Sequence, residues 1–220
     1  MSDFSTERLR MVDGQIRPSD VTDLRIIEAM LAIPREVFVP SHLRAVAYLD
    51  QEIAVGSAQA KRGLLKPVVL AKLLQAASVS SSDRVLIVGC ASGYSAAVAS
   101  RLAAQVVATE SDQALFEMAR SGLKQIGASN VTLSSANPID GAASSGPYDV
   151  ILVDGASEIP LDPLYGQLKD GGRLVAVSAM SAPARAVMVT RSGSDYGNRV
   201  LFDASAWILP GLARVPAFAF

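Results

Sequence analysis

The chain has 220 residues, half of them hydrophobic, so it can bury one sizeable core, and a single domain with a short N-terminal addition is expected. Twenty basic residues against 21 acidic ones give a net charge of -1, and because Lys and Arg form no block, nucleic acid is not the expected partner. Cys90 is the only cysteine, which excludes a disulfide framework and a thiolate metal site and favours a reducing, cytoplasmic location.

Residues 1–80 are expected to form an N-terminal helical addition. The first residues lack the apolar core of a signal peptide. A helix is predicted after Thr22, a candidate N-cap, and Pro34 ends it. Its apolar positions recur at helical spacing: Leu24, Ile27 and Leu31. A further helix is predicted over residues 41–48.

The connection 50–66 shows no clear periodicity. It is longer than most connections in compact domains, where such loops are either disordered or cover a site, so it is a candidate functional loop on the substrate side. Pro67 opens the next helix, which is predicted to reach about residue 79. This apolar stretch contains Lys72 and is too short to span a bilayer, so no membrane partner is expected.

Between residues 84 and 178, short β-rich runs alternate with helical ones, which is typical of a doubly wound α/β sheet with mostly parallel strands. Strands are predicted at 85–88, 106–109, 131–134, 150–153 and 173–177, and helices at 94–103, 112–126 and about 161–168. Gly127 stands where a helix C-terminal glycine is expected. Residues 179–220 are predicted to add antiparallel strands, 186–191 and 199–204, joined by the hairpin loop 192–197.

Gly89 and Gly93 bracket the turn between the first of these strands and its helix. Such a turn places backbone N–H groups and the positive end of the helix at the carboxyl edge of the sheet, where a partly anionic, nucleotide-like ligand can bind. A dinucleotide fingerprint, G-x-G-x-x-G, would require glycine at the positions of Ala91 and Tyr94, so a nicotinamide-dependent oxidoreductase is disfavoured. The alternative is a tight turn that binds nothing.

Glu110 lies 21 residues after Gly89, at the end of the second strand. A carboxylate at this position can accept hydrogen bonds from both hydroxyl groups of an adenosine ribose. The alternative role, a charge that only stabilises the N-terminus of the next helix, is less favoured. The sequence therefore predicts a ribose-binding carboxylate.

The glycine turn, Glu110, residues 148–154 and the segment LKDGGRL at 168–174 resemble the S-adenosylmethionine-dependent methyltransferases. From about Met11 onward the chain is similar to the protein-L-isoaspartate O-methyltransferases, through MVDGQIR at 11–17, IPREVFVP at 33–40 and AYLD at 47–50. The resemblance implies a Rossmann-like sheet of seven strands whose last members are rearranged. It also implies S-adenosylmethionine as cofactor and methyl transfer to the α-carboxyl of isoaspartyl residues in damaged proteins.

The resemblance also implies the residues of the site. Those expected to bind the cofactor are Gly89, Cys90, Ala91, Ser92, Gly93, Tyr94, Glu110, Ser111, Asn137 and Asp154. A carboxylate substrate is already ionised at pH 7, so positioning and desolvation, and no general base, are expected to drive the transfer. Candidates for the catalytic side are Ser57, Gln59, Lys61, Arg62 and Asp154.

Residues 56–67 depart from the family, whose substrate loop reads Gly-x-Gly-Gln-Thr-Ile-Ser-Gln-Pro. Here the sequence GSAQAKRGLLKP has three residues inserted between Gln59 and Pro67, and it lacks the threonine and the serine. Its cations either hold an anionic substrate or are solvated loop charges. Ile87 also stands where the family has an acidic residue, in the first strand of the α/β sheet. Two alternatives to isoaspartyl methylation therefore stay open: a non-catalytic paralogue that keeps the fold as a binding or regulatory module, and a methyltransferase with another anionic substrate.

Overall fold

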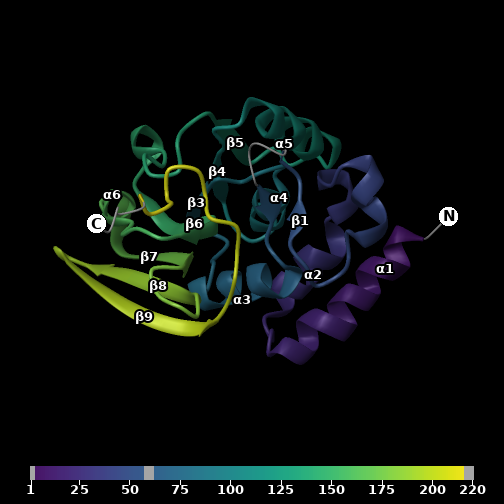
Figure 1. Ribbon diagram of the computed structural model, residues 1–220, viewed down its shortest axis with the longest axis horizontal. Coiled ribbons are helices and arrows are strands. Elements are labelled where there is room, and N and C mark those ends of the chain that lie inside the picture. The colour runs from purple at the N-terminus through teal and green to yellow at the C-terminus, as the bar shows by residue number, and fades with distance from the viewer. Residues whose placement is uncertain (1–2, 57–61, 216–220) are drawn as a thin grey trace, which may run out of the picture.

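The computed structural model describes residues 3–56 and 62–215. A seven-stranded sheet runs through the middle of the molecule (Figure 1), in the order β5-β4-β3-β6-β7-β8-β9. Its strands are β3 (Arg84–Val88), β4 (Gln105–Thr109), β5 (Val131–Ser134), β6 (Tyr148–Ser157), β7 (Leu168–Ser178), β8 (Arg185–Ser192) and β9 (Asp195–Asp203). β3 to β7 pair in parallel, whereas β8 and β9 are antiparallel additions at one edge. The predicted fold class is confirmed. At the antiparallel edge of the sheet, β8 lies next to β7 and β9 next to β8, so these strands follow one another as they do in the chain.

Helices cover the two faces of the sheet unequally. The larger core cluster joins one face to the helices α1 (Phe4–Met11), α2 (Leu24–Ala32), α3 (Pro67–Ala77), α4 (Tyr94–Ser100) and α5 (Gln113–Gln125). The opposite face packs against the short α6 (Asp162–Tyr165) and residues 209–212. β3 is buried on both sides, which explains why it reads as a continuous apolar run rather than an alternating one. No described helix combines the length and the apolar character that a membrane span requires.

The N-terminal predictions hold for the helices but need two corrections. Asp23, and not Thr22, caps α2, because its carboxylate accepts a hydrogen bond from the backbone N–H of Arg25 at 2.9 Å. The predicted helix 41–48 is a 3-10 helix over Ser41–Val46. Short π-helical and 3-10 stretches, Val12–Ile16 and Arg17–Ser19, follow α1.

The loop 50–66 is partly regular. β1 (Ile53–Ala54) and β2 (Gly63–Leu64) form a small antiparallel pair, and residues 57–61 between them lie outside the described part of the chain. Pro67 begins α3 as predicted. Arg62 is the first described residue after this gap, and its position is fixed by the pairing of the next residue, Gly63, with Ala54.

Three C-terminal boundaries differ from the prediction. The helix expected at 161–168 has only four residues, because Leu168 already pairs with Tyr148 in the sheet. Gly172 makes this early start of β7 feasible, since a Cβ there would lie 2.8 Å from the carbonyl oxygen of Lys169 and 3.0 Å from that of Tyr148. The hairpin loop is also shorter than predicted, because β8 and β9 extend to Ser192 and Asp195.

Candidate functional site

The glycine turn (residues 89–93) connects β3 to α4 in a tightly bent conformation. Gly89, Ala91 and Gly93 all have positive φ, of 69°, 48° and 100°. Alanine in this region is strained by about 1 kcal/mol or more, so Ala91 must be held by its surroundings. Gly93 is required for packing, since a Cβ there would lie 3.0 Å from the Cβ of Ala119 on α5. The turn is thus locked against the helix that follows Glu110.

Glu110 lies directly after β4 and its side chain is 1% exposed. Its Oε2 accepts hydrogen bonds from the backbone N–H of Ala91 at 2.8 Å and from Arg62 Nη2 at 2.6 Å. Its Oε1 accepts from the N–H groups of Ser111 and Asp112, at 2.9 and 3.1 Å. A carboxylate has about four lone-pair sites. All of them are therefore engaged by the chain itself.

Arg62 enters this site from the end of the β1–β2 connection. Its side chain is 1% exposed, and Nη2 also donates to the carbonyl oxygen of Gly89 at 2.8 Å. The guanidinium thus lies between the glycine turn and Glu110. The sequence left two roles open for the loop cations, binding of an anionic substrate or solvated charge, and burial excludes the second role for Arg62. Its Nε is buried without a hydrogen-bond partner among the described residues.

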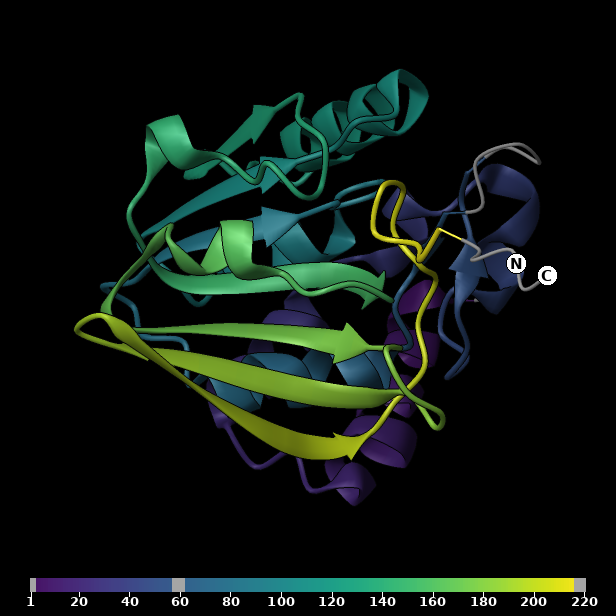
Figure 2. The same cartoon turned by 60° about the vertical axis from the view of Figure 1, so that its left-hand side comes forward.

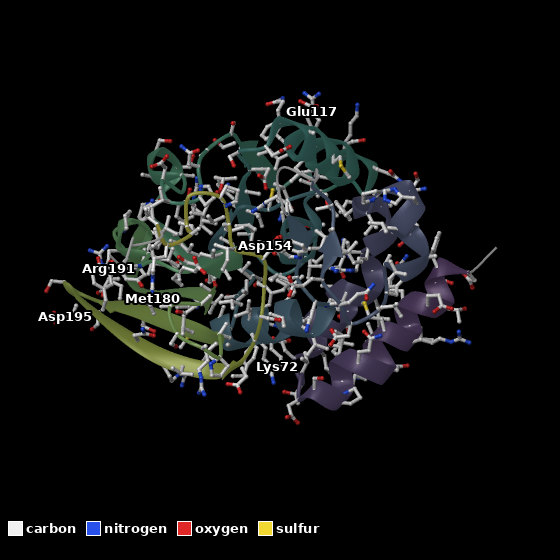
Figure 3. All side chains as sticks on the ribbon, viewed as in Figure 1. Lys72, Glu117, Asp154, Met180, Arg191 and Asp195 are labelled. Atoms are coloured by element: carbon white, nitrogen blue, oxygen red, sulfur yellow. The ribbon has the colours of Figure 1, made fainter. Side chains whose placement is uncertain are left out.

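Asp154 lies within β6 at the centre of the molecule (Figure 3), whereas Glu117 lies at its periphery. Asp154 is 2% exposed, and its carboxylate accepts a hydrogen bond from Ser95 Oγ, at the start of α4. Burial raises the pKa of this carboxyl from 3.8 to about 6, while the Ser95 hydrogen bond and the charges of Arg62 and Arg35 oppose the rise. A buried acid with a raised pKa, next to the helix that follows the glycine turn, is a candidate functional group.

The raised pKa of Asp154 predicts a pH-dependent contribution to stability. Because the folded state holds this proton more tightly than the unfolded state, the contribution is complete below pH 3.8 and is lost as the pH rises through about 6. Asp154→Asn keeps an acceptor for Ser95 and removes the titration. The unfolding free energy of the native chain, relative to this variant, is expected to fall by on the order of 2 kcal/mol between about pH 4 and pH 7 in urea titrations. A constant difference would show that Asp154 ionises normally.

A segment that the sequence did not single out covers the site. Residues 207–212, here called the covering segment, cross the carboxyl ends of β3 and β6 (Figure 2). The carbonyl oxygen of Trp207 accepts from the N–H of Ala156 at 2.8 Å, and the N–H of Leu209 donates to the carbonyl oxygen of Ala156 at 3.0 Å. The segment is therefore bonded to β6. It was missed because only two strands and the hairpin loop between them were predicted beyond residue 179.

The side chains of the covering segment fill the space above three glycines. A Cβ at Gly89 would lie 2.9 Å from Leu209 Cδ1, and one at Gly155 would lie 2.5 Å from Leu209 Cδ2. A Cβ at Gly63 would lie 2.5 Å from Trp207 Cδ1. Because these three glycines have no Cβ, the side chains of Trp207 and Leu209 can pack directly against the backbone there.

Most other predicted cofactor residues are tied into the protein. Ser92 Oγ donates to the carbonyl oxygen of Phe38, so this hydroxyl is directed to the N-terminal region. Cys90 is fully buried, and burial raises the pKa of its thiol well above its ordinary value. The Tyr94 ring packs against Phe38 and lies 4.5 Å from the Arg35 guanidinium carbon.

The remaining predicted residues fall into two groups. Ser111 is exposed, and only its backbone N–H contacts Glu110. Asn137 is exposed after the end of β5, and its side-chain amide donates to Asp140 at 3.1 Å. Cofactor binding by Asn137 stays a prediction. Three predicted substrate-side residues lie outside the described part of the chain: Ser57, Gln59 and Lys61.

In this arrangement the groups predicted to bind a ribose already have hydrogen-bond partners within the chain. Both oxygens of Glu110 are engaged, Arg62 also occupies the carbonyl oxygen of Gly89, and Leu209 fills the space above that glycine. Ile87, at the position of the family's acidic residue, is fully buried in the apolar core. A cofactor that uses Glu110 must first displace a donor that the chain supplies.

Comparison with known proteins gives consistent results. The family model described as protein-L-isoaspartate(D-aspartate) O-methyltransferase matches residues 7–198. A protein-L-isoaspartate O-methyltransferase of Roseiflexus castenholzii is 40% identical over 79% of this chain and 78% of its own length, and one of Methanoregula boonei is 40% identical over 87% of each.

Solved structures show the same fold. A protein-L-isoaspartate O-methyltransferase superimposes with a TM-score of 0.83 at 24% identity, over 93% of this chain and 66% of the other. A putative protein-L-isoaspartate O-methyltransferase from Plasmodium falciparum, solved with S-adenosyl-L-homocysteine, gives 0.77 at 15% identity, over 95% and 99%. The resemblance inferred from the sequence is confirmed, and the chain belongs to the protein-L-isoaspartate O-methyltransferase family.

Proposed function

We propose that this chain is an S-adenosylmethionine-dependent methyltransferase that methylates the carboxylate of isoaspartyl residues in proteins or peptides. Membership of the family, over residues 7–198, is the observation that carries the proposal. The position of Glu110 at the end of β4, beside the glycine turn, supports it, because a ribose-binding carboxylate is expected there in this type of fold. The buried, single cysteine fits the proposed cytoplasmic location.

The substrate side is proposed to lie where the β1–β2 connection meets the carboxyl end of the sheet. Ser57, Gln59 and Lys61 remain the candidates for contacts with the substrate carboxylate, on the basis of the resemblance. Arg62 is reassigned to the cofactor side because it binds Glu110. Asp154, held by Ser95, is proposed to line the site between the two sides.

A non-catalytic role is the second candidate, and the substrate loop favours it. Counted back from Pro67, the family's serine falls on Leu65 and its threonine on Gly63. Leu65 is buried and its carbonyl oxygen accepts from Arg35 Nη2 at 2.8 Å, and this position provides no hydroxyl. A protein of this kind would bind the cofactor without transferring its methyl group.

Two measurements separate these candidates. With labelled S-adenosylmethionine, methyl transfer to an isoaspartyl peptide is expected, and none to the same peptide with ordinary aspartate. Calorimetry with S-adenosyl-L-homocysteine reports binding independently of turnover. Binding without transfer to either peptide would favour the non-catalytic role. If neither the native chain nor Arg62→Gln binds at millimolar ligand, the proposal is contradicted.

A further inference from the structure

We infer that Arg62 is an internal competitor of the cofactor: its guanidinium holds the acceptor sites on Glu110 and Gly89, and the cofactor binds only after Arg62 has left. The inference rests on the proposed function and concerns the regulation of the same site. The contacts that carry it are two hydrogen bonds from Arg62 Nη2, at 2.6 Å to Glu110 Oε2 and 2.8 Å to the Gly89 carbonyl oxygen.

Among the described residues, four groups donate to Glu110, and Arg62 is the only side chain of the four. The other three are backbone N–H groups, of Ala91, Ser111 and Asp112. They are fixed, because the turn is bonded to β4 and the Asp112 side chain caps α5. A side chain can rotate away, whereas these N–H groups would move only if the turn or the helix unfolded. A ribose hydroxyl must therefore replace the guanidinium.

The hydrogen bonding of Arg62 is incomplete, which is the second observation. Its Nε is buried and has no hydrogen-bond partner in the described structure, although the side chain is 1% exposed. A buried polar atom without a partner is unfavourable. The ion pair with Glu110 thus holds Arg62 in the site, but the guanidinium does not have the full set of hydrogen bonds expected of a permanent structural contact.

Glutamine is the substitution that tests the inference at this position. Its side chain is neutral, so it cannot form the buried ion pair that joins Arg62 to Glu110 at 2.6 Å. Arg62→Gln therefore removes the competing charge.

The experiment compares the affinity for S-adenosyl-L-homocysteine of the native chain and Arg62→Gln by calorimetry. Because a ligand that binds only the open state loses affinity in proportion to the open fraction, Arg62→Gln is expected to bind at least about tenfold more tightly. Arg120→Gln is the matched control, since Arg120 lies exposed on α5. Its affinity is expected to equal that of the native chain.

Equal or weaker binding by Arg62→Gln, with measurable binding by the native chain, would overturn the inference and leave the proposed function intact. Absence of binding by both would overturn the proposed function and the inference with it. Arg62→Lys, which keeps a charge but not the planar group, is expected to give an intermediate gain and serves if Arg62→Gln fails to fold.

A second readout uses the native chain alone. Trp207 is the only tryptophan, and its indole packs against Gly63, the neighbour of Arg62. Departure of Arg62 is therefore expected to change the emission of Trp207 in a saturable way, with the same midpoint as the calorimetric titration. Binding of S-adenosyl-L-homocysteine without any change in this emission would overturn the inference.

Discussion

Replacing Glu110 with glutamine is expected to lower the free energy of unfolding by about 3 to 5 kcal/mol, the cost typical of removing one partner from a buried ion pair. The variant leaves the Arg62 guanidinium buried without a counter-ion, and the amide nitrogen of glutamine faces N–H donors that need an acceptor. Binding of S-adenosyl-L-homocysteine is expected to be lost as well. Denaturant titration and calorimetry measure the two effects.

Glu117→Gln is the control for this experiment. Glu117 forms an ion pair with Arg120 on the exposed face of α5, with 42% of its side chain accessible, so its loss is expected to change stability by no more than about 0.5 kcal/mol. Adding Arg62→Met to Glu110→Gln is expected to recover part of the stability, because both buried charges are then gone. If Glu110→Gln were as stable as the control, the buried ion pair would not support the fold.

Restoring the family's threonine at Gly63 is expected to destabilise the chain by about 3 kcal/mol. Its Cβ would lie 2.5 Å from Trp207 Cδ1 and 3.1 Å from the Ile53 carbonyl oxygen. The backbone that carries the indole is held in place, because the carbonyl oxygen of Trp207 and the N–H of Leu209 are both hydrogen-bonded to Ala156. Denaturant midpoints of the variant and the native chain measure the loss.

Two comparisons test this collision. In a Trp207→Ala background, Gly63→Thr is expected to cost less than about 1 kcal/mol, because the clashing ring is absent. Gly197→Thr is the matched control: it lies in β9, where an added Cβ meets nothing within 4 Å. A loss at Gly63 that persists without the indole would assign the effect to the backbone of β2 instead.

The sheet could be predicted from the sequence because its signals are local. Apolar runs mark β3 and β6, and Gly127, with φ of 69°, ends the helix region where a C-terminal glycine was expected. Glu110 was likewise found from its distance along the chain to the glycine turn. The N-cap of α2 differed by one residue, since Thr22 and Asp23 are both good caps and only the geometry distinguishes them.

The closure of the site could not be predicted, because it depends on contacts between residues far apart in the chain. Arg62 meets Glu110 across 48 positions, and nothing in either local sequence indicates which acid a loop cation will find. Leu209 lies against Gly89 after a segment without periodicity. What the sequence did provide was the departure from the family loop, which indicated that this part of the site would differ.

The covering segment has a consequence for the order of events during synthesis. The glycine turn and Glu110 belong to the first strands of the sheet and are synthesised early. Trp207 and Leu209 emerge only after all seven strands. A nascent chain therefore contains the glycine turn and Glu110 before it contains the residues that cover them.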